Sequence, residues 1–127
     1  MSINDLQHRL LSDLRDIGLN VDAVTIYLRP YSKTFYGRYY PVPYGSEFKP
    51  KIYLYPFIDK EGNLLPYDVI LSAAIHEMVH NEQYNEKDFV RNVGVMHNPE
   101  FWKKYNHYIK IAVEKGMLQI EKTVENY

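Results

Sequence analysis

The segment Tyr67–Tyr84 limits the fold most, because it is predicted to be a long helix whose interior carries ionisable groups. Pro66 suits the first turn of such a helix. His76, Glu77 and His80 stand inside its apolar part, and buried groups of this kind need polar partners. The apolar residues that recur at helical spacing are Val69, Ile70, Ala73, Ala74 and Val79.

Two further helices are predicted from spacing and capping residues. Residues 4–17 place leucines and Ile17 on one face, Ser2 or Asn4 can cap the start, and Gly18 can end the helix. Asn98, Pro99 and Glu100 form a typical helix start, and we expect this helix to run to about Lys115, before Gly116. The pattern of residues 85–97 is irregular, and the tail 117–127 is compatible with a short helix or a strand.

Three segments alternate as strands do, at residues 21–29, 34–40 and 51–58. Gly37 inside the second segment indicates a bulge or a close approach of the backbone. Residues 41–50 form a loop by their prolines and glycine, and residues 59–63 form a turn. The order of elements predicts an α+β fold with a small antiparallel or mixed sheet of about three strands, as one domain over residues 1–127.

The composition restricts the chemistry. There is no cysteine, so disulfides, thiolate catalysis and cysteine zinc sites are excluded, and a metal would need His, Asp or Glu ligands. The net charge of −1 does not favour nucleic acid as a partner. Because neither a membrane-spanning run nor a signal-peptide pattern is present, we expect a cytoplasmic protein without membrane contact, or a protein of the host cytoplasm or virion if the chain is viral.

The motif H-E-x-x-H at residues 76–80 predicts a metal site. Two histidines four positions apart share one helix face and can bind one zinc ion, while Glu77 can act as a general base. A catalytic zinc has three protein ligands and one open position. Gln83 and Glu86 stand where the metzincin pattern requires Gly and His, so that class is excluded, and His97 and Glu100 both stay candidates for the third ligand.

The pairing of H-E-M-V-H with the later H-N-P-E-F at residues 97–101 resembles the SprT-like metallopeptidase family, which includes the Spartan proteases. In that family, H-E-x-x-H is followed after a gap by H-G-P-x-F. The resemblance covers about residues 70–105 and implies a zincin-like fold with one Zn²⁺ per chain. It implies that His76, His80 and His97 are the zinc ligands and that Glu77 is the catalytic base in hydrolysis of a protein or peptide substrate.

The chain departs from the family at three points. Asn98 replaces the usual Gly, which is a mild change because Asn tolerates unusual backbone angles and caps helices. The cysteine-rich zinc ribbon of some relatives cannot form, and the DNA-binding and partner-recruiting tails of Spartan have no counterpart in the 127 residues. The resemblance therefore implies a peptidase core rather than repair of DNA–protein crosslinks.

Several other residues are candidates for supporting roles. Glu100 or Asp88 could orient a histidine, whereas Phe101 and Trp102 are expected to anchor the last helix in the core. His8 and His107 are expected to be surface or packing residues, although His107 is also a candidate for the role named next. Candidate donors to the oxyanion, by position in the sequence alone, are Tyr84, Arg91, Tyr105 and His107.

Two hypotheses compete with the peptidase. One is a catalytically inactive structural or interaction protein that zinc stabilises. Such a protein would belong to a larger assembly, which could be associated with nucleic acid or viral. The other is a nucleic-acid accessory protein with a basic patch formed by Arg29, Lys33, Arg38, Lys49 and Lys51. The many tyrosines between residues 27 and 67 suit a half-buried sheet, with a stacking or peptide-binding surface as the alternative. The oligomeric state stays open.

Overall fold

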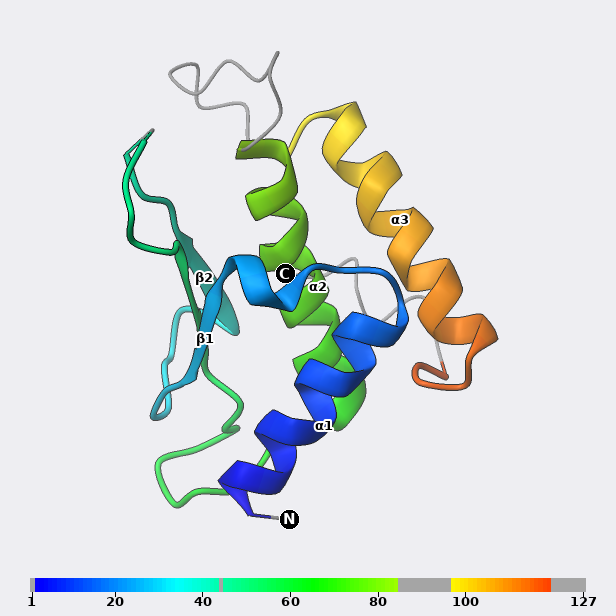
Figure 1. Cartoon of the computed structure of the whole chain (residues 1–127). Coiled ribbons are helices and arrows are strands. Elements are labelled where there is room, and N and C mark those ends of the chain that lie inside the picture. Colours follow the sequence, from blue (N-terminus) through cyan, green and yellow to red (C-terminus); the bar gives the residue numbers. More distant parts are fainter. Residues whose placement is uncertain (1, 44, 85–96, 120–127) are drawn as a thin grey trace.

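The computed structural model of the protein describes residues 2–43, 45–84 and 97–119. It has the predicted α+β fold, with a helix first, then a small sheet, then two more helices (Figure 1). The elements are α1 (Ile3–Asp16), the 3-10 helix η1 (Val21–Ala23), β1 (Thr25–Leu28), β2 (Gly37–Tyr40), β3 (Lys51–Leu54), α2 (Tyr67–Tyr84) and α3 (Pro99–Glu114).

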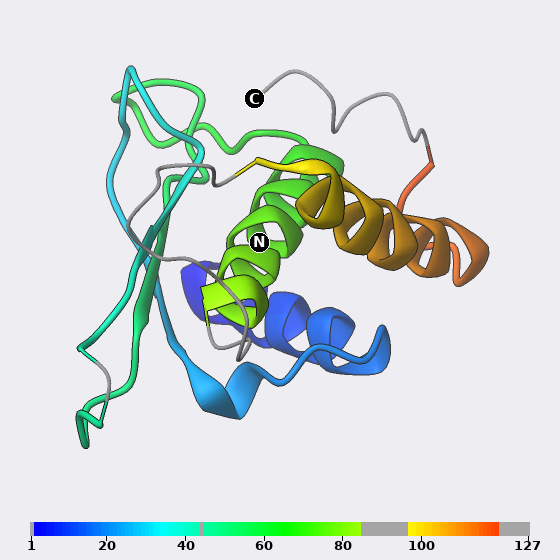
Figure 2. The same cartoon turned by 90° about the horizontal axis from the view of Figure 1, so that it is seen from above.

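The sheet is mixed, in the strand order β1-β3-β2. β1 runs parallel to β3, and β2 runs antiparallel to it, with Ile52 of β3 opposite both Ile26 and Tyr39. Figure 2 shows the three helices on one side of the sheet. Among the described residues β2 is therefore an edge strand, and it lies close to α2.

α2 is the centre of the core. Residues 70–81 of this helix are all buried, as is expected of a helix that other elements surround on most sides. Leu6, Leu10 and Leu14 of α1 pack in the same core, together with Ile52 and Leu54 of β3. Each fully buried side chain of this kind contributes about 1.5–3 kcal/mol, so packing places α2 firmly between the sheet and the other two helices.

The helix predictions are confirmed closely. α2 has the predicted bounds, and the Ser2 side chain caps α1 by accepting from the Asp5 N–H. α3 ends at the predicted place, with Lys115 as its cap and Gly116 at a φ of 76°. Of the tail predicted as a short helix or a strand, residues 117–119 form neither, and residues 120–127 lie outside the described part. Residues 85–96, most of the segment predicted to be irregular, also lie outside it.

The three strand predictions were too long. Residues 21–23 form a 3-10 helix because the Asn20 side chain accepts the Asp22 N–H and starts a turn. Residues 34–36 precede β2, because the Ser32 side chain accepts the N–H groups of Thr34 and Phe35. β3 ends at Leu54, and only an isolated bridge between residues 57 and 64 continues beyond Pro56, which has no N–H to donate.

No helix in the described parts of the chain is both long enough and apolar enough to cross a membrane.

Candidate metal centre

Three histidine side chains converge at one point between α2 and the start of α3. The Nε2 atom of His97 lies 3.0 Å from that of His76 and 3.1 Å from that of His80. The three ligand atoms all lie within 4.8 Å of one another. His76 and His80 are buried, whereas His97 is exposed, so the group has one side toward solvent.

This group could hold a metal ion. Zinc–nitrogen bonds of 2.0–2.1 Å in a tetrahedral site place neighbouring ligand nitrogens about 3.3 Å apart, close to the two observed Nε2 distances. A single proton on the His97 Nε2 cannot serve both contacts well, whereas a shared cation gives all three nitrogens a partner. Glu100, the other candidate for third ligand, is exposed in the first turn of α3 and does not belong to the group.

The surroundings keep the imidazoles neutral. Burial, with the charges of the other two histidines, lowers the pKa of His76 to about 3. Burial, with the charge of His97, lowers the pKa of His80 to about 4, and burial also lowers the pKa of His97. Because the neutral imidazole is the form that binds metals, all three side chains are ready as ligands near neutral pH.

Aromatic rings of α3 pack against the histidines. The Phe101 ring stacks on His80 with the centroids 4.6 Å apart and meets His76 edge-on at 4.8 Å. Trp102 lies beside His97, with the centroids 5.7 Å apart. Phe101 is fully buried and Trp102 is partly buried, which confirms both as core anchors and shows that they also restrict the imidazole rings.

Asn98 connects α2, which carries His76 and His80, with α3, which begins two residues after His97. Its Oδ1 accepts the N–H of Phe101, which caps α3, and also accepts from the Nε2 of the buried Gln83 near the end of α2. Both distances are 2.9 Å. This arrangement fixes the residue next to His97, so Asn98 has a defined role at the position where the SprT-like pattern has Gly.

We expect the Asn98→Ala substitution to lower the free energy of unfolding by about 1–3 kcal/mol, because a helix cap and a bond to a buried amide are both lost. Urea unfolding of the metal-free protein measures this loss. Asn98→Asp is the matched control, since its carboxylate can accept both hydrogen bonds. Equal stability of Asn98→Ala and the parent protein would contradict the assigned role.

Glu77 is buried under the backbone of the edge strand β2. A Cβ atom at Gly37 would lie 3.1 Å from the Glu77 Cγ and 3.1 Å from a methyl group of Leu54. This confirms the close backbone approach that was one prediction for Gly37. Burial raises the pKa of the Glu77 carboxyl to about 8 in the absence of a metal ion.

The metal-free protein should therefore lose stability as the pH rises from about 6.5 to 8.5. The folded state keeps a proton on Glu77 up to about pH 8, whereas the carboxyl of the unfolded chain loses its proton near pH 4.5. Each pH unit in this window therefore lowers the free energy of unfolding by at most about 1.4 kcal/mol. Below pH 6.5 His76 and His80 act in the opposite direction. Their pKa values are low in the folded state, so on acidification the histidines of the unfolded chain are protonated before those of the folded protein, which lowers the free energy of unfolding. Urea titrations in the presence of a chelator, repeated across this pH range, measure the effect. Above pH 6.5 the free energy of unfolding of Glu77→Gln should depend less on pH than that of the parent protein. An equal pH dependence in both proteins would contradict a raised pKa at Glu77.

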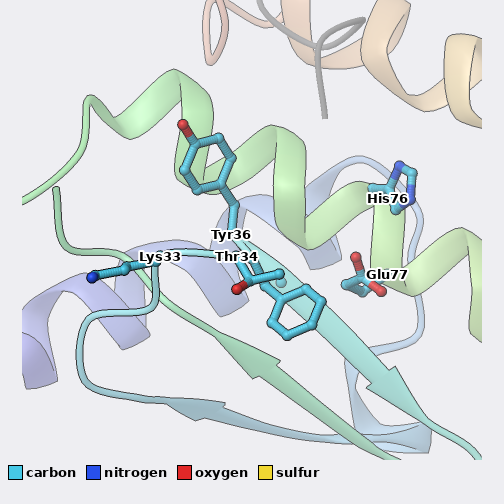
Figure 3. A pocket seen from close by; sticks show the side chains of 7 residues that line it. Lys33, Thr34, Tyr36, His76 and Glu77 are labelled. Atoms are coloured by element: carbon cyan, nitrogen blue, oxygen red, sulfur yellow. The ribbon is translucent and has the colours of Figure 1, made fainter.

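Two adjoining hollows open beside the histidines and Glu77. One, of about 340 Å³, is lined by residues 33–37 with His76 and Glu77, and the other, of about 260 Å³, adds Arg38, His80 and His97. Figure 3 shows His76 and Glu77 projecting from neighbouring positions of α2, with Glu77 directed toward the segment before β2. The three-histidine group is thus next to two hollows with a combined lining of residues from α2, β2 and the segment before β2.

Arg38, which the sequence indicated only as part of a possible basic patch, also lies at this site. It lines the second hollow, and its Cζ lies 4.9 Å from the centre of the Phe35 ring. Nothing local marks it, because its position depends on β2 being the edge strand beside α2.

The three predicted oxyanion donors that lie in the described part of the chain, Tyr84, Tyr105 and His107, do not line either hollow. Tyr84 packs on Tyr39, Tyr105 is fully buried beside Phe101, and His107 is exposed, as is His8. Arg91 and Asp88 lie outside the described residues.

Comparisons with known proteins do not extend this description. A scan against protein-family models finds no match, and searches of curated proteins and of solved structures find none either. The SprT-like resemblance therefore rests on the motif residues alone.

Proposed function

We propose that this chain is a zinc-dependent peptidase of the SprT-like type, with His76, His80 and His97 as ligands and Glu77 as general base. The observation that carries the proposal is that Glu77 and the three histidines line the same hollow. A purely structural zinc site needs three or four ligands, but neither a carboxylate beside them nor an accessible space.

Each residue has a role that follows from its place. The three neutral imidazoles would hold Zn²⁺, which when bound polarises a scissile carbonyl and lowers the pKa of a water molecule. Glu77 would take the proton of that water and pass it to the leaving nitrogen. A nearby cation lowers the pKa of a carboxyl, so metal binding would convert the protonated Glu77 of the metal-free protein into the basic form.

The edge strand β2 supports a peptide as the substrate. Gly37 lies at the start of this strand and lines both hollows. An extended peptide can add to the edge of a sheet through main-chain hydrogen bonds, and at β2 this would bring its backbone past Glu77. Arg38, which lines the second hollow, is a candidate donor to the oxyanion.

The proposal is tested by incubating zinc-loaded protein with unfolded casein and mapping new termini by mass spectrometry. Cleavage that a chelator stops and added zinc restores would support a peptidase. If the protein binds one zinc ion per chain but cuts neither casein nor a mixed peptide library, the inactive zinc-stabilised protein becomes the better description.

A further inference from the structure

The sheet has a second face, on the side away from the helices. Figures 1 and 2 both show α1, α2 and α3 on one side of the sheet. Ile26, Tyr39 and Ile52 point to that side and are buried. Because side chains alternate along a strand, their neighbours point to the opposite side, which is called the outer face below.

Three tyrosine rings adjoin across the outer face. The strand register places Tyr27 of β1 opposite Tyr53 of β3. The Tyr27 and Tyr53 ring centroids are 5.5 Å apart, and those of Tyr40 and Tyr53 are 4.9 Å apart. Tyr27 is 42% exposed, while Tyr40 and Tyr53 are partly exposed. The rings thus form a continuous aromatic surface that spans all three strands.

Basic side chains surround these rings. The Arg29 Cζ lies 5.2 Å from the centre of the Tyr53 ring, and the Arg38 Cζ lies 5.4 Å from that of Tyr40. Lys51 is opposite Tyr40 in the register and is exposed. None of the residues in β1, β2 and β3 is acidic. Residues 23–58 hold five basic residues and one acidic residue, although the whole chain has a net charge of −1.

Sheet preference alone explains tyrosines in strands, but it does not explain why the strand residues beside them include Arg38 and Lys51 and no acidic residue. Planar rings beside guanidinium groups match a ligand with both flat apolar faces and negative charges. Single-stranded nucleic acid has both, because its unpaired bases stack on aromatic rings and its phosphates pair with Arg and Lys. An acidic peptide would satisfy the cations without using the rings, and a duplex keeps its bases stacked inside.

We propose that the outer face binds single-stranded nucleic acid, with bases on Tyr27, Tyr40 and Tyr53 and phosphates on Arg29, Arg38 and Lys51. Of the five basic residues considered for a patch from the sequence, three lie on this face. The proposal does not require a bound metal ion, but it shares Arg38 with the proposed peptidase site, because Arg38 also lines the second hollow. Phe35 lies under Arg38 and also lines both hollows, so the bound strand would lie close to the site that contains Glu77.

The test is fluorescence anisotropy of the full chain with labelled oligothymidine and oligouridine of about 12 nucleotides and a duplex of the same length, at about 50 mM and 200 mM salt. We expect the single strands to bind more tightly than the duplex, and the binding to weaken as salt rises. The DNA and RNA oligomers reveal whether the 2′-hydroxyl matters. Absence of binding at the lower salt, or equal binding of the duplex, would overturn the proposal.

Variants locate the binding. Tyr27→Ala should weaken binding about 5- to 100-fold, whereas Tyr27→Phe keeps the ring and should bind nearly as the parent protein does. The double variant Arg29→Ala, Arg38→Ala should also weaken binding. The control is the double variant Lys103→Ala, Lys110→Ala, which removes the same number of positive charges from exposed positions of α3. Equal loss in both double variants would mean that binding is unspecific attraction and would overturn the site.

A measurement on the parent protein removes any doubt about folding of the variants. Backbone amide shifts of Tyr27, Arg38 and Tyr53 should move when oligothymidine is added, while those of α3 stay in place. Shifts of these strands with polyglutamate but not with the oligonucleotides would replace nucleic acid by an acidic protein partner and overturn the proposal.

Discussion

Glu77→Gln is expected to lower peptidase activity about 10²- to 10⁴-fold, the usual contribution of a general base, while leaving the metal content unchanged. The amide has nearly the volume of the carboxyl but cannot take a proton from water. Glu77 lines the hollow beside the histidines and is not one of the three converging side chains that could hold a metal ion, so its substitution should not lower the metal content. Initial rates of casein cleavage at equal zinc occupancy measure the effect.

Glu100→Gln is the matched control for this substitution. It makes the same chemical change on an exposed carboxylate of α3, three residues after His97, and should leave the rate within about twofold of the parent protein, as most surface substitutions do. Equal loss of rate in both variants, or full activity of Glu77→Gln, would remove Glu77 from the mechanism. Because burial raises its pKa, Glu77→Gln should also fold at least as stably as the parent protein without metal.

Removal of the metal ion is expected to lower the melting temperature by roughly 10–20 °C. Free metal at about 1,000 times its dissociation constant stabilises a folded protein by about 4 kcal/mol, and for a domain of this size each kcal/mol corresponds to about 3–5 °C. The site joins α2 to the start of α3, so the bound ion would connect two consecutive helices across a separation of 17 to 21 residues. Calorimetry with zinc and with chelator measures the difference.

His76→Ala and His8→Ala separate the site from general effects of zinc. His8 is exposed on α1, away from the converging histidines, so its substitution should leave the response to zinc intact. His76→Ala should remove most of the response. A zinc-dependent rise of the same size in both variants would place the ion elsewhere.

The parts of the fold that follow from local rules were predictable from the sequence. α2 has the predicted bounds because the apolar spacing is dense and Pro66 precedes it. Asn98 and Pro99 likewise defined the start of α3. Strand ends were not predictable from alternation, because the side chains of Asn20 and Ser32 divert the backbone into turns while the alternating pattern continues.

The site was predictable where it depends on one helix or one cap. His76 and His80 share a face of α2, and the convergence of His97 with them agrees with the ligand set that the H-N-P-E-F motif implied. Arg38 and the hollows were not predictable, since they depend on the strand order β1-β3-β2, which no short segment encodes. The predicted oxyanion donors Tyr84 and Tyr105 were chosen by distance along the chain, and the packing turns both toward other aromatic rings instead.

Metal content of untagged protein, measured by mass spectrometry for the parent chain, His97→Ala and Glu100→Ala, tests the three-histidine site most directly. The structure leads us to expect about one zinc ion per chain in the parent protein and in Glu100→Ala, and little or none in His97→Ala. Within residues 2–43, 45–84 and 97–119, His97 is the residue that completes a possible metal-binding group with the Nε2 atoms of His76 and His80. Absence of bound metal from all three proteins after zinc is added back would contradict the site, and the proposed peptidase with it.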